Sequence, residues 1–332
     1  MSVPSFISHL GKKYNKRLEI SMENLFLDER HILGKGAFGI VYKGILTKPD
    51  GPTVVAIKTV VNTVDVSYFK VLLSELRVMT NLGVHPNIVN LVGAVTSNIE
   101  NRKLWMVMEF CELGNVSSYL QNCREKMKSD QLAEQLNVVG NNFKSEYVTF
   151  SNGDEKVTSV LYSDLLKWSI QTASGMEFLG EKRIIHGDLS ARNLLLTGTK
   201  DIKVSDFGLS RQLVYNSSLY VKKSDGPIPW KWMAPEALSD MNFSTSSDVY
   251  AFGITLWELF SYGEIPFSEW NYGKEFLDRL KCGDLFPEEP TIGGKDVYQV
   301  MMQCWKLDRR LRLSFTELKS IFLKMYNDEI RI

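Results

Sequence analysis

The stretch IIHGDLSARNLLL, residues 184–196, places a dense cluster of polar side chains between two apolar runs. The polar cluster contains His186, Asp188, Arg192 and Asn193, whereas the flanking residues are typical of short buried strands. Strands on both sides would hold the loop between them rigidly, as an active site requires. The stretch therefore predicts an active-site loop.

A second carboxylate follows at short range, in the sequence VSDFG at residues 204–208. Asp188 with Asn193 after it, and then Asp206, can supply a general base and oxygen ligands for Mg²⁺. Phosphoryl transfer needs little else from side chains besides positioning and charge neutralisation. An isolated Asp-Phe-Gly arises by chance fairly often, so its weight depends on the other motifs of the chain.

Residues 34–41, GKGAFGIV, form a glycine-rich segment between two apparent strands. Glycines let the backbone fold tightly over phosphates and present N–H donors to them. A dinucleotide-binding turn is the alternative, but that turn requires a helix directly after its last glycine. Here the strand-like residues 40–44 follow. This order favours a hairpin that covers a nucleotide, and it argues against an unrelated nucleotide enzyme such as a Rossmann dehydrogenase.

Lys58 ends the apolar strand-like run of residues 55–58, where an unpaired ammonium would be costly to bury. It could be an edge lysine whose charge reaches water. It could instead bind phosphate oxygens and a carboxylate, and Glu75 is a candidate because it lies among leucines of a predicted helix. Alone, Glu75 would be an ordinary solvated residue. Together with the upstream glycines, the pair becomes informative.

These motifs follow one another along the chain and end in Ala234-Pro235-Glu236. Because of this set and its order, the chain resembles the eukaryotic protein kinase family from about Leu25 to Tyr326. The resemblance implies an α+β fold of two lobes with ATP in the cleft between them. The N-lobe would be small and β-rich with one main helix, and the larger C-lobe would be mainly helical.

The resemblance also implies a role for each motif residue. Asp188 would accept the proton of the substrate hydroxyl, Lys58 would bind the α- and β-phosphates, and Mg²⁺, with Mn²⁺ as an alternative, would be held by Asn193 and Asp206. The implied catalytic residues are Lys58, Glu75, Asp188, Arg192 and Asn193. The implied nucleotide-binding residues are Leu33, Gly34, Gly36, Phe38, Gly39, Val41, Ala56, Lys58, Met108, Glu109, Cys111 and Leu195. Among them, Met108 would be the gatekeeper, and Glu109 and Cys111 would form hydrogen bonds with adenine through their backbones.

Two motifs favour tyrosine as the phosphorylated residue. Serine/threonine kinases usually carry a lysine two residues after the catalytic aspartate, where this chain has Ser190, and the sequence Ser-Ala-Arg-Asn at 190–193 is similar to that of receptor-type tyrosine kinases. The sequence PWKWMAPE at 229–236 is similar to the tyrosine-kinase docking loop. The implied substrates are tyrosine-containing proteins.

A further resemblance is to the receptors for vascular endothelial and platelet-derived growth factors. It rests on Tyr215 and Tyr220, on the Glu-Phe-Cys hinge at 109–111, and on an insertion after Leu120. It implies dimerisation for trans-autophosphorylation, and Tyr147 in the insertion could recruit a phosphotyrosine-reading adaptor or could be an ordinary exposed tyrosine. The parent protein would be a plasma-membrane receptor, with this chain as a cytoplasmic fragment or a soluble relative.

The expected domain organisation follows from the pattern along the chain. Residues 1–24 would be a juxtamembrane-like segment, 25–110 the N-lobe, 111–120 the hinge and the start of the C-lobe, 121–160 a partly disordered kinase insert, and 161–328 the C-lobe. Strands are expected around residues 40–42, 54–57 and 105–108. Helices are expected around residues 68–82, 161–179, 249–260, 297–305 and 315–326.

The bulk composition fits this interpretation. The 39 basic and 39 acidic residues balance, so no overall field favours nucleic acid. The four cysteines have no metal-ligand spacing and suggest a reducing compartment. The N-terminus lacks an apolar signal-peptide core, and the longest apolar stretch, residues 249–262, carries Glu258 and is too short to span a bilayer. We therefore expect a soluble cytoplasmic domain.

Several positions depart from the family pattern. Gly187 stands where most such kinases have an arginine that pairs with a phosphate on the activation loop. The missing arginine predicts that activity depends less on that phosphate. It is also the best argument for the alternative of a pseudokinase scaffold. Trp230 and Pro227 are unusual in the docking loop. Arg312 is retained to pair with Glu236. A further residue, Asp248, would brace the catalytic loop or simply cap the helix that follows it.

Overall fold

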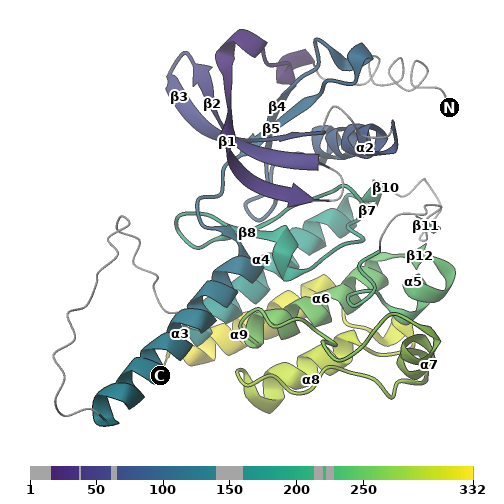
Figure 1. Cartoon of the computed structure of the whole chain (residues 1–332). Helices are drawn as coiled ribbons and strands as arrows, with labels where there is room; N and C mark the ends of the chain where they lie inside the picture. Colours follow the sequence, from purple (N-terminus) through teal and green to yellow (C-terminus); the bar gives the residue numbers. More distant parts are fainter. Residues whose placement is uncertain are drawn as a thin grey trace.

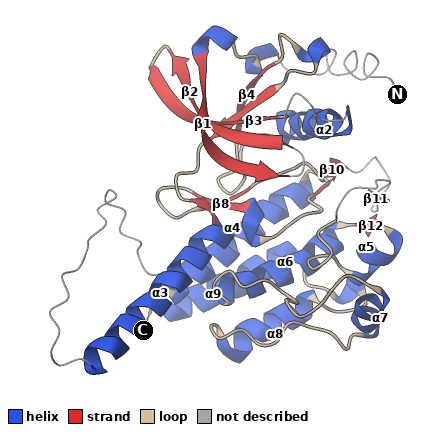
Figure 2. Ribbon diagram, in the orientation of Figure 1, coloured by secondary structure: helices blue, strands red, loops and turns tan. Residues whose placement is uncertain are grey.

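A computed structural model describes residues 16–36, 39–60, 66–139, 160–212, 220–221 and 228–331 of the 332-residue chain. Strands gather in one lobe and helices in the other (Figures 1 and 2). A two-lobed α+β architecture, as expected from the sequence, is therefore confirmed.

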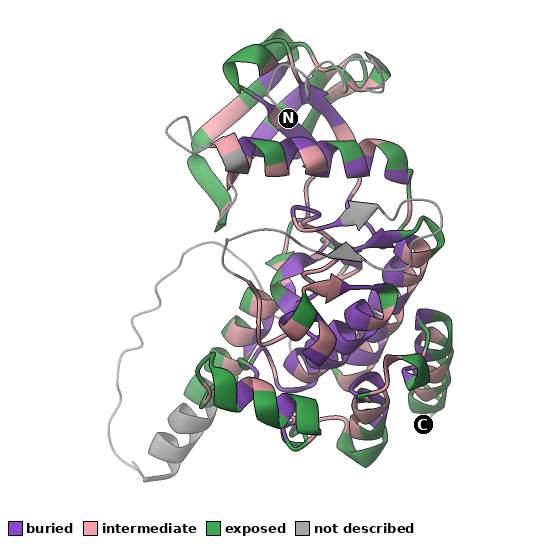
Figure 3. Ribbon diagram, turned by 90° about the vertical axis from the view of Figure 1, so that its right-hand side faces the viewer, coloured by how far each residue is buried: buried purple, intermediate pink, exposed green. Residues whose placement is uncertain are grey.

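The N-lobe is a five-stranded antiparallel sheet with the strand order β1-β2-β3-β5-β4. Its strands are β1 (Leu25–Gly36), β2 (Gly39–Lys48), β3 (Gly51–Thr59), β4 (Leu91–Val95) and β5 (Trp105–Glu109). Helix α2 (Val66–Leu82) packs on one face of the sheet through the buried residues Phe69, Leu72 and Leu76. Figure 3 shows buried and exposed positions alternating along this helix. The opposite face carries a smaller core around Leu46 and Ile57. Side chains that alternate along each strand thus serve two different faces.

The N-terminal segment runs beside the edge strand β4. Ile20 N donates to Ala94 O at 2.9 Å, and the Glu19 carboxylate accepts from Thr96 N at 2.9 Å and from Thr96 Oγ1 at 2.7 Å. Gly93 permits this approach, because a Cβ at that position would lie 2.4 Å from Leu18 O. The segment between Leu18 and Ile20 therefore covers the backbone groups of an otherwise open sheet edge.

The C-lobe is built around helix α6, whose residues are mostly buried. Its helices are α3 (Val116–Val139), α4 (Tyr162–Glu181), α5 (Pro235–Asp240), α6 (Thr245–Phe260), α7 (Lys274–Cys282), α8 (Gly294–Cys304) and α9 (Phe315–Glu329). Its short strands are β6 (Gly114–Asn115), β7 (Ile184–Ile185), β8 (Leu194–Leu196), β9 (Ile202–Val204), β10 (Arg211–Gln212), β11 (Tyr220–Val221) and β12 (Asn242–Phe243). Short 3₁₀ turns are η1 (Lys16–Leu18), η2 (Met22–Asn24), η3 (Ile99–Asn101), η4 (Ala191–Asn193) and η5 (Arg309–Leu311).

No helix in the described part of the chain combines the length and the apolar character that crossing a bilayer requires. The strands and helices expected from periodicity are all present, with ends that differ by a few residues. The kinase insert expected at residues 121–160 stays a prediction, because α3 covers only its first part, to Val139. Good helix formers such as Gln, Glu, Lys, Leu and Ala do not need an apolar stripe to be helical. A helix can thus form here without apolar periodicity, and residues 140–159 lie outside the described residues.

One buried ion pair joins α5 to the loop before α9. Arg312 Nη1 and Nη2 donate to the two oxygens of Glu236 at 2.6 and 2.9 Å, and Arg312 also donates to Ser246 O and Lys306 O. The Arg312 side chain is only 1% exposed. The predicted pairing of Arg312 with Glu236 is thus confirmed, and it fixes the segment after the docking loop to the C-lobe.

We expect Arg312→Leu to lower the free energy of unfolding by about 3–5 kcal/mol, because it leaves a half-buried carboxylate and several carbonyls without their donor. The loss is measured by urea unfolding followed by circular dichroism. Arg310→Leu is the matched control, since Arg310 pairs with Asp308 but its side chain is 83% exposed, and it should change stability little. Equal effects of the two substitutions would contradict this interpretation.

Candidate active site

Helix α6 holds the loop that starts after β7. Asp248 Oδ2 accepts from His186 N at 2.8 Å, and Asp248 Oδ1 accepts from Gly187 N at 2.9 Å. Burial raises the pKa of Asp248 to about 7, and the two backbone donors offset part of that rise. The expectation that Asp248 braces the loop is confirmed, whereas the capping alternative is wrong, because Ser244 is the N-cap of α6.

Gly187 has a backbone conformation that suits glycine. Its φ is +75°, in the left-handed region, and a Cβ there would meet only Leu209 O at 3.5 Å and the Phe243 ring at 3.9 Å. Space is therefore available, but a side chain would add roughly 1 kcal/mol of backbone strain. Glycine at this position therefore lets the loop turn between His186 and Asp188 without that strain.

Asp188 lies at the centre of a small hydrogen-bonded group on and beside η4. Asn193 Nδ2 donates to Asp188 Oδ2 at 3.0 Å and to Asp188 O at 2.7 Å, and Arg192 forms an ion pair with Asp188 Oδ1. Burial raises the pKa of Asp188 to about 6, although Arg192 and Asn193 oppose the rise. The carboxylate is thus mostly ionised at neutral pH and can accept a proton from a hydroxyl.

Lys58 joins the two lobes through its ammonium group. Its Nζ donates to both Glu75 oxygens, at 2.9 and 2.8 Å, and to Asp206 Oδ1 at 3.1 Å. Burial opposes a charge on Lys58, but the two carboxylates more than compensate and raise its pKa. Burial raises the pKa of Glu75 to about 7, and Lys58 offsets part of the rise. The alternatives of an edge lysine and a solvated glutamate are wrong, because both residues are buried.

Asp206 adopts an uncommon backbone conformation next to Lys58. Its φ is +62°, an uncommon value for a residue other than glycine, and Gly208 N donates to Asp206 Oδ1 at 3.1 Å. Burial raises the pKa of Asp206, but the Lys58 charge outweighs this effect and the pKa falls below its ordinary value. Its side chain is 40% exposed, so the carboxylate is charged and accessible.

The donor set fits Mg²⁺ better than a metal held by the protein alone. Within the described residues no group of three or more His, Cys, Asp or Glu side chains could hold a metal ion. The amide nitrogen of Asn193 donates to Asp188, which leaves the amide oxygen of Asn193 free of that bond and able to act as a metal ligand. Mg²⁺ keeps several waters and takes only one or two protein ligands together with phosphate oxygens. Asn193 and Asp206 therefore match its requirements.

The residues expected to contact the nucleotide come from both lobes. Val41 lies opposite Lys58 in the β2–β3 ladder, and Ala56 lies opposite Met108 in the β3–β5 ladder. Leu33, Gly34 and Gly36 belong to β1, Gly39 begins β2, Leu195 lies on β8, and the hinge residue Cys111 is buried. Phe38 lies outside the described residues. The role of each in binding stays a prediction.

The Glu109 side chain does not face this cleft. Its Oε1 accepts from Asn90 N at 2.7 Å and pairs with Lys203 Nζ at 2.9 Å, so it ties the hinge to β9 and to the residue before β4. Only the backbone of Glu109 is left for the adenine contact that the sequence predicts.

Glu258 is a functional residue that the motifs did not identify. This buried residue of α6 accepts from Ala191 N at 2.8 Å and from Trp232 Nε1 at 2.8 Å, and burial raises its pKa to about 7. Trp232 in turn packs under the Arg192 guanidinium, 4.5 Å from the ring centroid. Glu258 thereby links the catalytic loop to the docking loop. A lone glutamate inside an apolar helical run was the signal that could have revealed it.

We expect Lys58→Met to make stability fall as the pH rises from 5 to 8. The variant leaves Glu75 buried without its partner, so the pKa of Glu75 rises further above its value in the unfolded chain. A carboxyl with a raised pKa in the folded state stabilises the fold at low pH, and this contribution is lost as the pH rises through the folded pKa, by up to ~1.4 kcal/mol per pH unit. Urea unfolding across this pH range measures the slope.

The matched control is Lys58→Met/Glu75→Gln, which removes the titrating group but keeps the other buried carboxyls. The difference in unfolding free energy between the two variants isolates Glu75. Parallel pH profiles of the single and double variants would show that Glu75 is not the titrating group.

Comparison with known proteins agrees with this geometry. A family model described as protein tyrosine and serine/threonine kinase matches residues 27–322. Vascular endothelial growth factor receptor 1 of Mus musculus is 35% identical over 90% of this chain, receptor 3 of Danio rerio is 35% identical over 91%, and receptor 2 of Danio rerio is 36% identical over 86%.

The chain spans about a quarter of the length of these relatives, with 25%, 23% and 24% of each receptor covered. The family model matches most of the chain, and this match shows the family. The chain belongs to the protein tyrosine and serine/threonine kinase family.

Proposed function

We propose that this chain is the catalytic domain of a receptor-type tyrosine kinase that transfers the γ-phosphate of ATP to tyrosine hydroxyls, including its own. The observation that carries the proposal is the convergence of three charged side chains from two lobes, with Lys58 Nζ within 3.1 Å of both Glu75 and Asp206. Kinases generally use ATP and a divalent metal, and we propose Mg²⁺ here, with Mn²⁺ as an alternative.

Each of these residues has a separate role in the proposed reaction. Lys58, oriented by Glu75, would bind phosphate oxygens of ATP, and Asn193 and Asp206 would hold the metal, which neutralises phosphate charge when bound. Asp188 would accept the proton of the attacking hydroxyl, since its carboxylate is ionised at neutral pH and held in place by Asn193 and Arg192. Positioning and charge neutralisation supply most of the catalysis in such transfers.

Two contacts support tyrosine over serine as the acceptor. Ser190, at the position where serine/threonine kinases usually carry lysine, is fully buried and carries no charge of its own. Arg192 takes over that role, because it pairs with Asp188 and stacks on Trp232 of the docking loop. A docking loop fixed to the catalytic residues in this way gives a phenolic side chain a rigid surface to lie against.

The receptor assignment rests on the relatives named above, which are growth factor receptors by name. We propose that the parent protein is a plasma-membrane receptor with this domain on its cytoplasmic side, and that dimerisation allows trans-autophosphorylation of tyrosines. Tyr147 and Tyr215 lie outside the described residues, so a role for Tyr147 in recruiting phosphotyrosine-reading adaptors stays a prediction.

The pseudokinase alternative finds no support in the site. Its best argument was Gly187, yet the backbone of Gly187 is held by Asp248 and the charged residues around it are all present. A scaffold without turnover would have no need for the pairing of Lys58 with two carboxylates.

The proposal predicts Mg²⁺-dependent phosphorylation of poly-Glu/Tyr by the purified chain, with little transfer to serine-containing polymers. Incorporation of ³²P from ATP measures both. Asp188→Asn keeps the size of the side chain but removes the base, so turnover should fall by at least ~10²-fold. Transfer to serine at a comparable rate would overturn the choice of tyrosine, and equal rates with Asp188→Asn would overturn the role of Asp188.

Activity should depend only weakly on activation-loop phosphate. Gly187 supplies no cation for that phosphate, and a backbone contact stands in for it, because Tyr220 and Val221 of β11 pair with Phe243 and Asn242 of β12. We expect Tyr215→Phe/Tyr220→Phe to reduce kcat/KM by less than tenfold under matched conditions. Steady-state kinetics of both proteins, with phosphorylation checked by mass spectrometry, decide the matter, and a larger loss refutes the expectation.

A further inference from the structure

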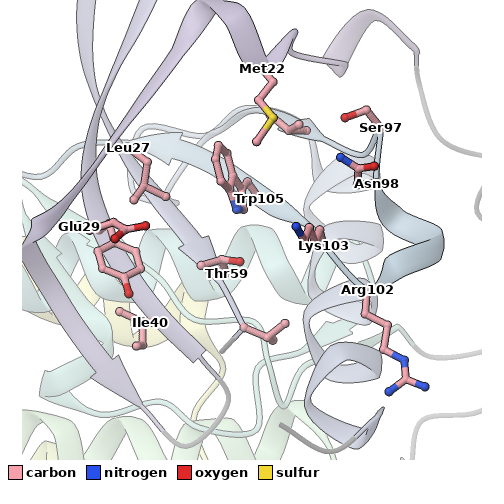
Figure 4. Close-up of a pocket in the computed structure, with 13 residues that line it drawn as sticks. Met22, Leu27, Glu29, Ile40, Thr59, Ser97, Asn98, Arg102, Lys103 and Trp105 are labelled. Carbon is pink, nitrogen blue, oxygen red and sulfur yellow. The ribbon is translucent and has the colours of Figure 1, made fainter. Parts of the chain in front are cut away.

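A cavity of about 320 Å³ lies on the N-lobe sheet away from the catalytic residues (Figure 4). Its floor includes Ile40, Thr59, Trp105 and Val95, which the strand pairing places directly opposite one another on β2, β3, β5 and β4. Neighbours in such a row have Cβ atoms about 5 Å apart, so the four side chains form one continuous surface.

This cavity is separate from the nucleotide cleft, because it opens on the other face of the sheet. Side chains alternate between the faces of a strand. Lys58 and Val41 point into the cleft, so their neighbours Thr59 and Ile40 point to the opposite face, where they line the cavity. A ligand on this face would leave the site of phosphoryl transfer free.

The cavity combines an apolar interior with a charged rim. Ile40 and Val95 are buried, the Trp105 ring is partly buried, and Leu27 and Met22 add apolar walls. A volume of about 320 Å³ is at the lower end of the range for pockets that bind small molecules. An aromatic or branched apolar group would therefore find both contact area and a ring to pack against.

The rim presents cations on one side. Arg102 and Lys103 are exposed, and neither forms an ion pair within the described residues. Arg102 has a left-handed backbone with φ +59°, an unusual conformation for this residue type that fixes the turn after η3. Glu29 is on the β1 side of the cavity, away from Arg102 and Lys103 (Figure 4). The charges thus favour an anion at one end only.

We propose that this cavity binds a small organic anion. Its aromatic or branched apolar body packs on Ile40, Trp105 and Val95, and its single anionic group pairs with Arg102 and Lys103. Glu29 excludes a second anionic group at the opposite end by charge repulsion. The site is new relative to the kinase chemistry and does not depend on turnover.

Fluorescence titration with 8-anilinonaphthalene-1-sulfonate, an aromatic monoanion, tests the proposal on the full chain. The titration is run with saturating AMP-PNP and Mg²⁺, so that the nucleotide cleft is closed to the probe. We expect saturable binding that AMP-PNP does not displace. Loss of binding when AMP-PNP is added would show that the probe occupies the cleft, and would overturn the proposal.

Two double variants test whether the probe binds at this cavity. Arg102→Glu/Lys103→Glu should weaken the binding of the sulfonate at least tenfold, while the binding of the neutral N-phenyl-1-naphthylamine changes less than twofold. Lys70→Glu/Arg77→Glu is the matched control, because it makes the same change of charge at exposed positions of α2 that do not line the cavity. Equal weakening by both double variants would mean that only overall charge matters, and would refute the site.

Thr59→Trp should fill the cavity and weaken both probes at least tenfold. This substitution also removes the hydrogen bond from Thr59 Oγ1 to Leu104 O, so Thr59→Val serves as its control, since it loses the bond but keeps the space. The thermal unfolding midpoint of each variant shows that the fold is retained. Unchanged sulfonate binding in Thr59→Trp and in Arg102→Glu/Lys103→Glu would overturn the proposal.

Discussion

The burial of the Lys58 ammonium between two carboxylates is the constraint on which the rest of the structure depends. An isolated charge in such a place would cost several kcal/mol, so the ammonium can remain there only while Glu75 and Asp206 are both within hydrogen-bonding distance. Glu75 comes from α2 and Asp206 from the C-lobe, which means that one charge holds three separate elements together. In the proposed reaction, the phosphates of ATP would join the same group of charges. The arrangement that makes the lysine tolerable in the protein interior is thus also the one that catalysis requires.

Helix α6 plays the corresponding part for the C-lobe. Asp248 and Glu258 are buried in a helix that is otherwise mainly apolar, and each accepts hydrogen bonds from backbone N–H groups of the active-site loop. Buried acceptors are costly when unpaired and directional when paired, so they fix the position of a loop better than apolar packing does. Because burial raises the pKa of both carboxyls toward neutrality, their hold on the loop is coupled to pH. The positions of Asp188 and Asn193 therefore depend on these hydrogen bonds to the neighbouring backbone of the loop.

The sequence predicted the parts of the structure in which chemistry and local pattern agree. Apolar periodicity identified α2 and α9, and the motif order brought Lys58, Asp188 and Asp206 to one cleft. Glu258 was overlooked because no motif contains it, and its partners, Ala191 and Trp232, are distant in sequence. The extent of α3 could not be read from the sequence, because helix propensity leaves no apolar periodicity along this segment. Contacts between distant segments, such as the one from Glu109 to Lys203, are set by the fold and cannot be read from either residue alone.

The alternation of side chains along β3 explains why so much depends on a nine-residue strand. Val55 and Ile57 fill the small core on one face, while Ala56 and Lys58 face the cleft on the other. A shift of the β2–β3 register by one residue would exchange the two sets, bury the lysine among apolar side chains and expose the core. The pairing of Lys58 with Glu75 therefore agrees with the apolar pattern of β3 on which face of the strand meets the cleft. The same alternation places Ile40, Thr59, Trp105 and Val95 side by side on the outer face, so the position of Lys58 and the surface of that face are linked through one register.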